Sequence, residues 1–495
     1  MNHRVDRPVN QPAGHPVNPV TDPVNAPVAD PVADTGAALF VGIDIGTSGV
    51  RAVAIDAAGR QQGQGSAPLE PPRSDGAARR QSPALWWTAV HTALAALFAQ
   101  VAARRVQALA VDGTSGTLLA TDAGGQPVSD GWMYHDASCA DEARLLQRHA
   151  PAESAAQGGS SPLARMLRLQ HLHPRAARVL HQADWIAGRL AGRFGASDTH
   201  NALKLGFDPV SETWPDWMDA LGVRRDWLPR VQRPGTPIGP VAPQLAAAFG
   251  LPPQACIVAG TTDGVAAFLA TGAQHPGDAV TSLGTTLVVK VLSSAPVFAP
   301  AYGIYSHRLG DLWLAGGASN SGGGALLRHF SAEQMAQLTP RLRPDEPTGL
   351  GYYPLPAPGE RFPVHDPHWP SRTTPRPADD AVFFQALLEG VADVERMAFE
   401  RIAELGAPYP QRLFTVGGGA GNSAWSRLRA RRLGCAMATP AHEQAACGAA
   451  RLAREAMARR ACGQAEPPAQ SARGDEDRAR RARDDAAPAR RGAPA

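Results

Sequence analysis

Short apolar runs alternate with longer amphipathic stretches along the chain, and this alternation predicts strands interleaved with helices. The runs Leu39–Ile45 and Arg51–Ile55 flank a Gly-Thr-Ser-Gly turn and predict two neighbouring strands. After a third predicted strand, apolar residues recur at helical spacing over Pro83–Val101. A buried strand is expected at Val106–Val111, immediately before Asp112. Three strands, a helix and a further strand in this order predict a mixed sheet rather than a Rossmann fold.

The same order begins again in the second half of the chain. A strand-turn-strand hairpin is predicted over Ala279–Leu292, and a long amphipathic helix over Ala381–Leu405. The predicted strand Arg412–Val416 leads through a glycine-rich turn into a helix that begins at Ser423. Further predictions are two helices, two short strands and a proline-rich loop, at His173–Arg189, Asn320–Phe330, Ile257–Ala259, Asp311–Leu314 and Thr339–Arg376.

The length of 495 residues exceeds what one hydrophobic core usually supports, so two α/β domains are predicted. The repeated pattern places these domains at residues 37–271 and 272–460. Residues 1–36 are rich in proline, and residues 461–495 mix arginine, aspartate, alanine and proline without apolar periodicity. Both tails are therefore predicted to be disordered.

Composition narrows the class of protein. Hydrophobic residues make up 44% of the sequence and charged residues 19%, as in soluble globular proteins. The formal net charge of +3 gives no indication of a nucleic-acid or membrane partner. The sequence shows neither a membrane-spanning apolar run nor a signal peptide, so a cytoplasmic location is predicted. Only Lys204 and Lys290 are lysines among 48 basic residues, so arginine is the general basic residue here.

The first predicted turn carries candidate chemistry. Asp44 ends an apolar strand, and a buried carboxylate there needs either a hydrogen-bond donor or a cation. The adjoining Gly46, Thr47 and Ser48 offer backbone N–H groups and hydroxyls that suit a phosphate. A carboxylate beside such a turn is where a Mg²⁺-nucleotide would bind. The alternative is an ordinary hairpin whose aspartate bonds the turn amides.

A second copy of this turn favours the nucleotide interpretation. Gly284, Thr285 and Thr286 lie between two apolar runs, about 240 residues after the first copy, which is the length of a domain. No P-loop sequence is present, so these paired turns are the candidate phosphate-binding elements.

Three further turns follow predicted strands. Asp263 is a candidate general base toward a substrate hydroxyl, although a helix N-cap is the commoner role for such a residue. The glycine-rich turn suits a nucleoside, with Trp425 against the base, or is a plain loop above a core tryptophan. A polyol site or a simple turn is indicated near Asp112. The candidate residues at the last two turns are Gly418, Gly419, Asn422, Trp425, Asp112, Thr114 and Ser115.

Together these motifs resemble the FGGY carbohydrate kinases of the actin/Hsp70/sugar-kinase superfamily. The resemblance runs from Ala38 to Met457. The segments that carry it correspond to the two phosphate motifs, the adenosine motif and the motif of the catalytic aspartate, at Phe40–Asp56, Ser282–Thr286, Thr415–Trp425 and Gly260–Gly264. The resemblance implies two ribonuclease-H-like (actin-like ATPase) domains, each a mixed sheet flanked by helices, with the active site in the cleft between them.

The resemblance also implies roles for the candidate residues. ATP and a ketopentose would be the substrates, with Mg²⁺ as cofactor, and the protein would be a monomer or homodimer. Asp263 would be the general base, and Asp44 would hold Mg²⁺ through water. Phosphate contacts would come from Gly46, Thr47, Ser48, Gly284, Thr285 and Thr286, adenosine contacts from Gly418, Gly419, Asn422 and Trp425, and sugar contacts from Asp44, Asp112, Thr114, Ser115 and Asp263.

Within the family the chain is most similar to the D-ribulokinases, and D-ribulose is the expected substrate. The similar segments are Val111–Thr117, Met133–Asp136, Ser197–Asp208 and Gly316–Asn320. A xylulokinase is the alternative, and a non-catalytic nucleotide sensor on the same fold is a second one from another class. One departure is Arg165, at a position where the family carries lysine.

Overall fold

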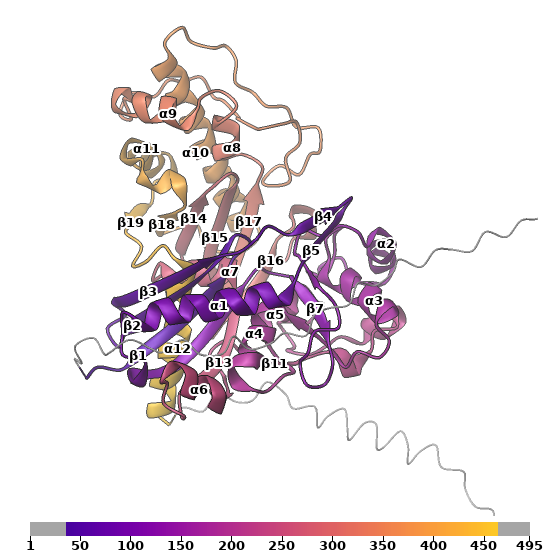
Figure 1. Ribbon diagram of the computed structural model, residues 1–495. Helices are drawn as coiled ribbons and strands as arrows, with labels where there is room; N and C mark the ends of the chain where they lie inside the picture. Colours follow the sequence, from indigo (N-terminus) through magenta and orange to yellow (C-terminus); the bar gives the residue numbers. More distant parts are fainter. Residues whose placement is uncertain (1–35, 464–495) are drawn as a thin grey trace, which may run out of the picture.

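The computed structural model describes residues 36–463, so the predicted disorder of the two tails lies outside the described residues. Two six-stranded sheets form the frame, one in each half of the chain, and a smaller five-stranded sheet stands beside the first (Figure 1). Within residues 36–463 no helix is both long and apolar enough to cross a bilayer.

The first sheet contains the predicted N-terminal strands. Its central strand β1 is buried along its whole length, pairs antiparallel with β2 and parallel with β6, and so forms the mixed sheet that was predicted. The order is β12-β13-β6-β1-β2-β3. The bounds are β1 Leu39–Ile45, β2 Gly49–Asp56, β3 Gln61–Pro68, β6 Val106–Gly113, β12 Pro237–Pro240 and β13 Cys256–Thr262.

The second sheet repeats this topology. A hairpin of β14 and β15 continues antiparallel into β17, and β18 and β19 add parallel strands on the other side. The strands that correspond to β1, β2, β3, β6 and β13 of the first sheet are β14, β15, β17, β18 and β19. The order is β16-β17-β15-β14-β18-β19. The bounds are β14 Asp278–Leu283, β15 Leu287–Ser293, β16 Tyr305–Leu309, β17 Leu312–Ser319, β18 Arg412–Val416 and β19 Ala436–Ala438.

Helices cover both faces of each sheet. On the first sheet α1 (Pro83–Phe98), α4 (Gln182–Ala191) and α6 (Pro243–Phe249) build one hydrophobic core. On the second sheet α10 (Asp380–Glu404) and α11 (Ser423–Leu433) build another. Two short helices, α8 (Gly323–Leu326) and α9 (Ala332–Leu338), accompany α10 at the far end of the second domain (Figure 1).

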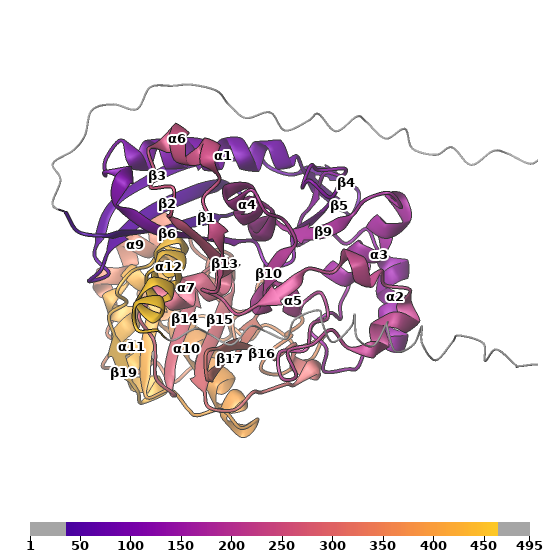
Figure 2. The ribbon, with the colours of Figure 1, turned by 90° about the horizontal axis from the view of Figure 1, so that it is seen from below.

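A pair of crossing helices joins the domains. Helix α7 (Asp263–Ala270) packs on the second sheet through Phe268, and α12 (Ala445–Ala461) packs on the first sheet against β1 and β6. The two helices touch where α12 carries Gly448: a Cβ there would lie 1.9 Å from the carbonyl oxygen of Ala266. Figure 2 shows α7 and α12 side by side beneath the first sheet. The chain therefore returns to its first domain after completing the second.

A smaller sheet extends the first domain sideways, in the order β4-β5-β8-β7-β9. It packs with α2 and α3, away from the second domain (Figure 1). The bounds are β4 Arg73–Asp75, β5 Ala78–Gln81, β7 Leu118–Thr121, β8 Gly131–Trp132, β9 Arg178–His181, α2 Ala140–His149 and α3 Pro162–Leu172.

Two predicted helices differ from the structure. The predicted helix over His173–Arg189 was wrong in its first half, because Arg178–His181 forms β9 and pairs with β7. This tertiary pairing outweighs the helical spacing of the apolar residues, and α4 begins only at Gln182. The predicted helix over Asn320–Phe330 shrinks to Gly323–Leu326, since three consecutive glycines favour turns over helix. The long helix and the proline-rich loop were predicted correctly.

Candidate active site

Three predicted carboxylates lie at neighbouring strand ends of the first domain. Asp44 on β1 stands opposite Asp112 on β6 in the parallel register, and Asp112 stands opposite Thr261 on β13. Asp263 follows β13 directly, as the first residue of α7. The carboxyl ends of adjacent parallel strands thus bring together residues that are more than 200 positions apart, as in ligand sites of open α/β sheets.

Asp44 and Asp112 form a tightly coupled pair. Asp112 is fully buried, and no N–H or hydroxyl group of the described residues reaches either of its carboxylate oxygens. Its pKa is raised well above the usual range, by burial and then by the charge of Asp44. Burial also raises the pKa of Asp44. Two charged carboxylates this close repel each other, so the pair takes up a proton more readily than two separate carboxylates would.

Asp263 sits where the two domains meet. Its Oδ1 accepts a hydrogen bond of 2.7 Å from the N–H of Gly264. The Nζ of Lys290, on β15 of the second domain, donates to the carbonyl oxygen of Gly264. Burial lowers the pKa of Lys290 to about 8, while the nearby charge of Asp263 acts in the opposite direction. The carboxylate of Asp263 and the ammonium group of Lys290 therefore both contact Gly264, each from a different domain.

The two predicted phosphate turns are both tight hairpins. Gly46 N–H donates to the carbonyl of Gly49 over 3.0 Å, and Gly284 N–H donates to that of Thr286 over 3.2 Å. Ser48 and Thr285 at the tips are exposed. Each turn leaves backbone N–H groups and hydroxyls open to a ligand, as a phosphate-binding role requires.

A second glycine cluster supports the turn of the second domain. Gly323 N–H and Gly324 N–H donate to the carbonyls of Gly284 and Thr285, both over 2.9 Å. A Cβ on Gly322 would lie 2.8 Å from the carbonyl carbon of Thr286. These contacts fix the turn backbone to backbone. The three glycines at the start of α8 were not among the predicted site residues, although their run in the sequence was a usable signal.

The glycine-rich turn after β18 lies against the same region. A Cβ on Gly417 would be 2.9 Å from the carbonyl oxygen of Leu283, the residue before Gly284. Gly418 is exposed and a Cβ there would meet nothing within 4 Å, so its backbone is accessible. Asn422 caps α11, since its Oδ1 accepts from Trp425 N–H over 3.0 Å. The predicted phosphate and adenosine turns are thus adjacent.

Trp425 does not have the position that contact with a base requires. Its side chain is only 4% exposed, and its indole Nε1 donates to the carbonyl of Leu388 over 3.1 Å. The ring packs beneath the turn, where a Cβ on Gly419 would lie 2.6 Å from it. Burial of a large aromatic ring in the α10–α11 core stabilises more than a surface position would. Trp425 therefore supports the turn from below.

The hydroxyl of Thr114 also takes part in hydrogen bonds within the protein. Its hydroxyl donates to Gln182 Oε1 over 2.9 Å and lies 2.6 Å from the hydroxyl of Thr117. The hydroxyl of Thr117 in turn accepts from the N–H of Tyr134 over 3.0 Å. Ser115 remains half-exposed and is the more accessible of the two predicted sugar-contact hydroxyls.

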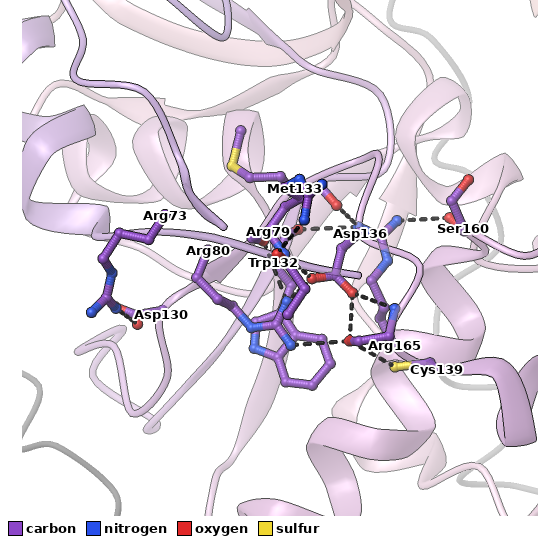
Figure 3. A network of polar contacts seen from close by, with 12 residues as sticks. Arg73, Arg79, Arg80, Asp130, Trp132, Met133, Asp136, Cys139, Ser160 and Arg165 are labelled. Carbon is purple, nitrogen blue, oxygen red and sulfur yellow. Dashed lines mark hydrogen bonds and ion pairs between the residues drawn. The ribbon is translucent and has the colours of Figure 1, made fainter. Parts of the chain in front are cut away.

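A polar network holds the Met133–Asp136 loop in place (Figure 3). Asp136 is fully buried, forms an ion pair with Arg80 and accepts the N–H of Arg79 over 2.5 Å. Arg165 is 1% exposed and donates to the carbonyls of Trp132, Met133 and Ser160. Burial lowers its pKa to about 9. Arg165 therefore serves as an internal brace for this loop.

The comparisons with known proteins agree with this arrangement. The N-terminal domain model of the FGGY family of carbohydrate kinases matches residues 39–270, and the C-terminal domain model matches residues 279–457. The chain belongs to the FGGY family of carbohydrate kinases. The two domains of this kinase, each built on one of the six-stranded sheets, accordingly have the actin-like ATPase fold.

Several relatives of the kinase are xylulose kinases. That of Streptomyces coelicolor is 30% identical over 83% of this chain and 86% of its own length. That of Escherichia coli is 26% identical over 84% and 89%. A solved structure titled as a xyloylose kinase from Brucella ovis superposes with a TM-score of 0.75 at 25% identity, covering 87% of this chain and 92% of that one.

Two basic residues of the kinase near Asp263 were missed as site residues. His200 on α5 (Thr199–Leu203) connects the domains, because its Nδ1 accepts from Thr261 Oγ1 over 2.7 Å and its Nε2 donates to the carbonyl of Arg308 over 2.6 Å. Burial lowers its pKa to about 4, so the ring is neutral. Lys290 is the other, and its signal was in the sequence: it is one of only two lysines in an arginine-rich chain.

Proposed function

We propose that this kinase transfers the γ-phosphoryl group of ATP to the terminal hydroxyl of a pentulose, with D-ribulose as the preferred substrate. The observation that carries the proposal is the position of Asp263, at a strand end beside the Asp44–Asp112 pair and at the contact between the domains. The reaction belongs in the cytoplasm, and the quaternary state that we adopt is a monomer or homodimer.

The side chains near Asp263 suit this chemistry. Within residues 36–463 only its Oδ1 accepts a hydrogen bond, so Oδ2 is available to accept the proton of the attacking hydroxyl. Lys290 supplies positive charge next to it, where negative charge accumulates during phosphoryl transfer. The carboxylate oxygens of Asp112, which have no hydrogen-bond partner within residues 36–463, can accept a hydrogen bond from a second sugar hydroxyl. Positioning and charge stabilisation are the main tasks of a protein in such a reaction.

A magnesium ion fits the remaining donors. Within residues 36–463 no three His, Cys, Asp or Glu side chains converge on one point as a closed metal cage would require. Mg²⁺ in kinases is held instead by one or two carboxylates together with phosphate oxygens and water. Asp44 would hold it, through water, and the unpartnered oxygens of Asp112 lie beside it. When bound, the ion neutralises charge on the phosphates.

The nucleotide is proposed to lie along the turns of both domains. Gly46, Thr47 and Ser48 face its phosphates from the first domain, and Gly284, Thr285 and Thr286 from the second. The exposed Gly418 and the half-buried Gly419 take the adenosine with their backbone, and Asn422 holds the turn by its cap. Because Trp425 is buried, its part is to support Gly419.

The preference for D-ribulose rests on four segments similar to D-ribulokinases. Contacts of these segments support the proposal: Thr117 bonds Tyr134 and so joins two of them, while His200 of the third bonds Thr261 and Gly316 of the fourth pairs with Lys290 across the sheet. The names of the relatives favour the alternative, D-xylulose. The presence of Asp263 speaks against a non-catalytic sensor.

A substrate panel distinguishes these alternatives. We expect kcat/KM for D-ribulose to exceed that for D-xylulose by at least about tenfold, since one well-placed hydroxyl contact is worth that much. Coupled ADP release with D-ribulose, D-xylulose, L-ribulose, ribitol and glycerol measures the ratio. A higher value for D-xylulose would replace D-ribulose as the substrate, and no turnover of any of them would contradict the proposal.

Lys290 gives a prediction about pH. A lysine loses its charge as the pH rises through its pKa, which is about 8 here, so wild-type kcat is expected to fall above this pH. Lys290→Met is expected to lower kcat about tenfold to a hundredfold and to remove that alkaline decline. Rate profiles from pH 7 to 9.5 check this. The same alkaline limb in the variant would mean that another group titrates.

Lys204→Met is the matched control, because Lys204 is the other lysine and lies 5.8 Å from the ring centre of Tyr305. Its substitution is expected to keep the alkaline limb but to shift it to higher pH, because the charge of Lys204 lowers the pKa of Lys290.

A further inference from the structure

A cavity lies at the junction of the two domains, away from the carboxylates of the proposed active site. Its volume is about 320 Å³, and residues of both domains line it. Leu269, at the last turn of α7, and Leu292, near the end of β15, belong to its walls. Asp263 is at the opposite end of the same helix, and the Gly284 turn is at the opposite end of the hairpin. Helix α7 therefore separates this cavity from the proposed active site.

The walls of this cavity carry an excess of positive charge. Arg233, Arg308, Arg451 and Arg459 contribute guanidinium groups, whereas Glu455 is the one carboxylate in the lining. A second carboxylate, Glu212 outside the lining, bonds Arg233 over 2.9 Å and lies 3.9 Å from Arg308. Two acidic groups thus face four basic ones, which favours an anionic ligand.

Arg451 gives the strongest indication that the cavity binds an anion. Its exposure is 8%, and its Nε makes no hydrogen bond with any residue of the described range 36–463. Its nearest carboxylate oxygen, on Glu455, is 3.9 Å from Nη2, beyond hydrogen-bond distance. A buried charged donor without an acceptor is costly, and an anion in the cavity would satisfy it.

We propose that this cavity, which we call the hinge pocket, binds the phosphate group of a small organic phosphate. Arg451 on α12 and Arg308 at the β16–β17 turn grip the phosphate from opposite domains. The leucines of the lining contact the organic part of the ligand. A ligand held this way ties α12 to the second sheet, so its binding is coupled to the relative position of the domains. The inference does not depend on the identity of the sugar substrate.

Calorimetry in phosphate-free, low-salt buffer tests the proposal, with D-ribose 5-phosphate, AMP and inorganic phosphate as probes. Stronger binding of the sugar phosphate or of AMP than of inorganic phosphate supports the proposal and identifies the organic part, whereas equal binding of all three would contradict the contact of the leucines with an organic part. Arg451→Gln is expected to weaken binding at least about tenfold, because a charge-assisted hydrogen bond is lost. Arg454→Gln, on the same helix but outside the lining, is the matched control and is expected to bind like the wild type.

Arg308→Gln tests the opposite wall and keeps the proposal testable if the Arg451 variant does not fold. It is expected to weaken binding by a similar factor. Unchanged affinity in both folded variants, an equal loss in Arg454→Gln, or no binding by the wild type at millimolar probe would overturn the proposal. Because no turnover is measured, these outcomes are independent of whether the kinase phosphorylates D-ribulose.

Discussion

Asp263→Asn is expected to lower kcat by about three orders of magnitude without unfolding the kinase. General-base catalysis is worth about 10²–10⁴-fold, and asparagine cannot accept the hydroxyl proton. The amide is nearly isosteric with the carboxylate, and its oxygen can still accept the N–H of Gly264, as Oδ1 does now over 2.7 Å. The start of α7 and the contact from Lys290 should therefore survive the change.

The measurement is ADP release under saturating ATP and D-ribulose, with the midpoint of thermal unfolding as the test of folding. Asp311→Asn is the matched control, because Asp311 is exposed in the β16–β17 turn and its loss should leave kcat within about twofold. More than a tenth of wild-type activity in Asp263→Asn would contradict the assignment of Asp263 as the base.

Arg429→Leu is expected to destabilise the second domain by about 3–5 kcal/mol. Arg429 and Glu395 are both fully buried and form a two-pronged ion pair, with both N–O distances 2.6 Å. Thr281 on β14 and Thr415 on β18 complete the hydrogen bonds. Removing the guanidinium leaves a buried carboxylate unpaired, which is the costly case for an internal ion pair. Urea unfolding followed by tryptophan fluorescence measures the loss.

The double variant Arg429→Leu with Glu395→Leu separates charge from packing. Replacing both charges by apolar groups is often neutral, so the double variant should recover most of the stability lost by the single one. If the double variant is as unstable as Arg429→Leu, packing rather than the unpaired charge is responsible. The pair joins α10 and α11 to strands that end at the two turns proposed to bind the nucleotide, so the KM for ATP should rise in the single variant.

The repeated hairpin was predictable because its signals are local. Apolar runs broken by Gly-Thr-Ser or Gly-Thr-Thr specify two strands and a tight turn, whatever surrounds them. The positions of the three candidate aspartates were predictable for a related reason: two lie near the ends of buried strands and one directly follows such a strand, and parallel strands bring these ends together. Asp44, Asp112 and Asp263 meet for this reason.

Features that depend on tertiary partners were not predictable from spacing. A tryptophan after a glycine-rich turn can contact a base or lie in the core, and only the packing of α10 shows that the ring of Trp425 is buried. Arg178–His181 fits a helix until β7 offers a pairing edge. The contact of Lys290 with Gly264 joins two domains, and no local pattern encodes it. The raised pKa of Asp112 likewise depends on burial by strands distant in sequence.

The return of α12 to the first domain has a consequence for synthesis of the chain. Until Ala445–Ala461 has left the ribosome, the apolar face of β1 and β6 that this helix covers stays open. Residues 271–444 lie between α7 and α12, and at about 5–20 residues per second their translation takes roughly 9–35 seconds. During that time the nascent first domain exposes an apolar surface. Ribosome-associated chaperones bind surfaces of this kind, so we expect one to bind the nascent chain.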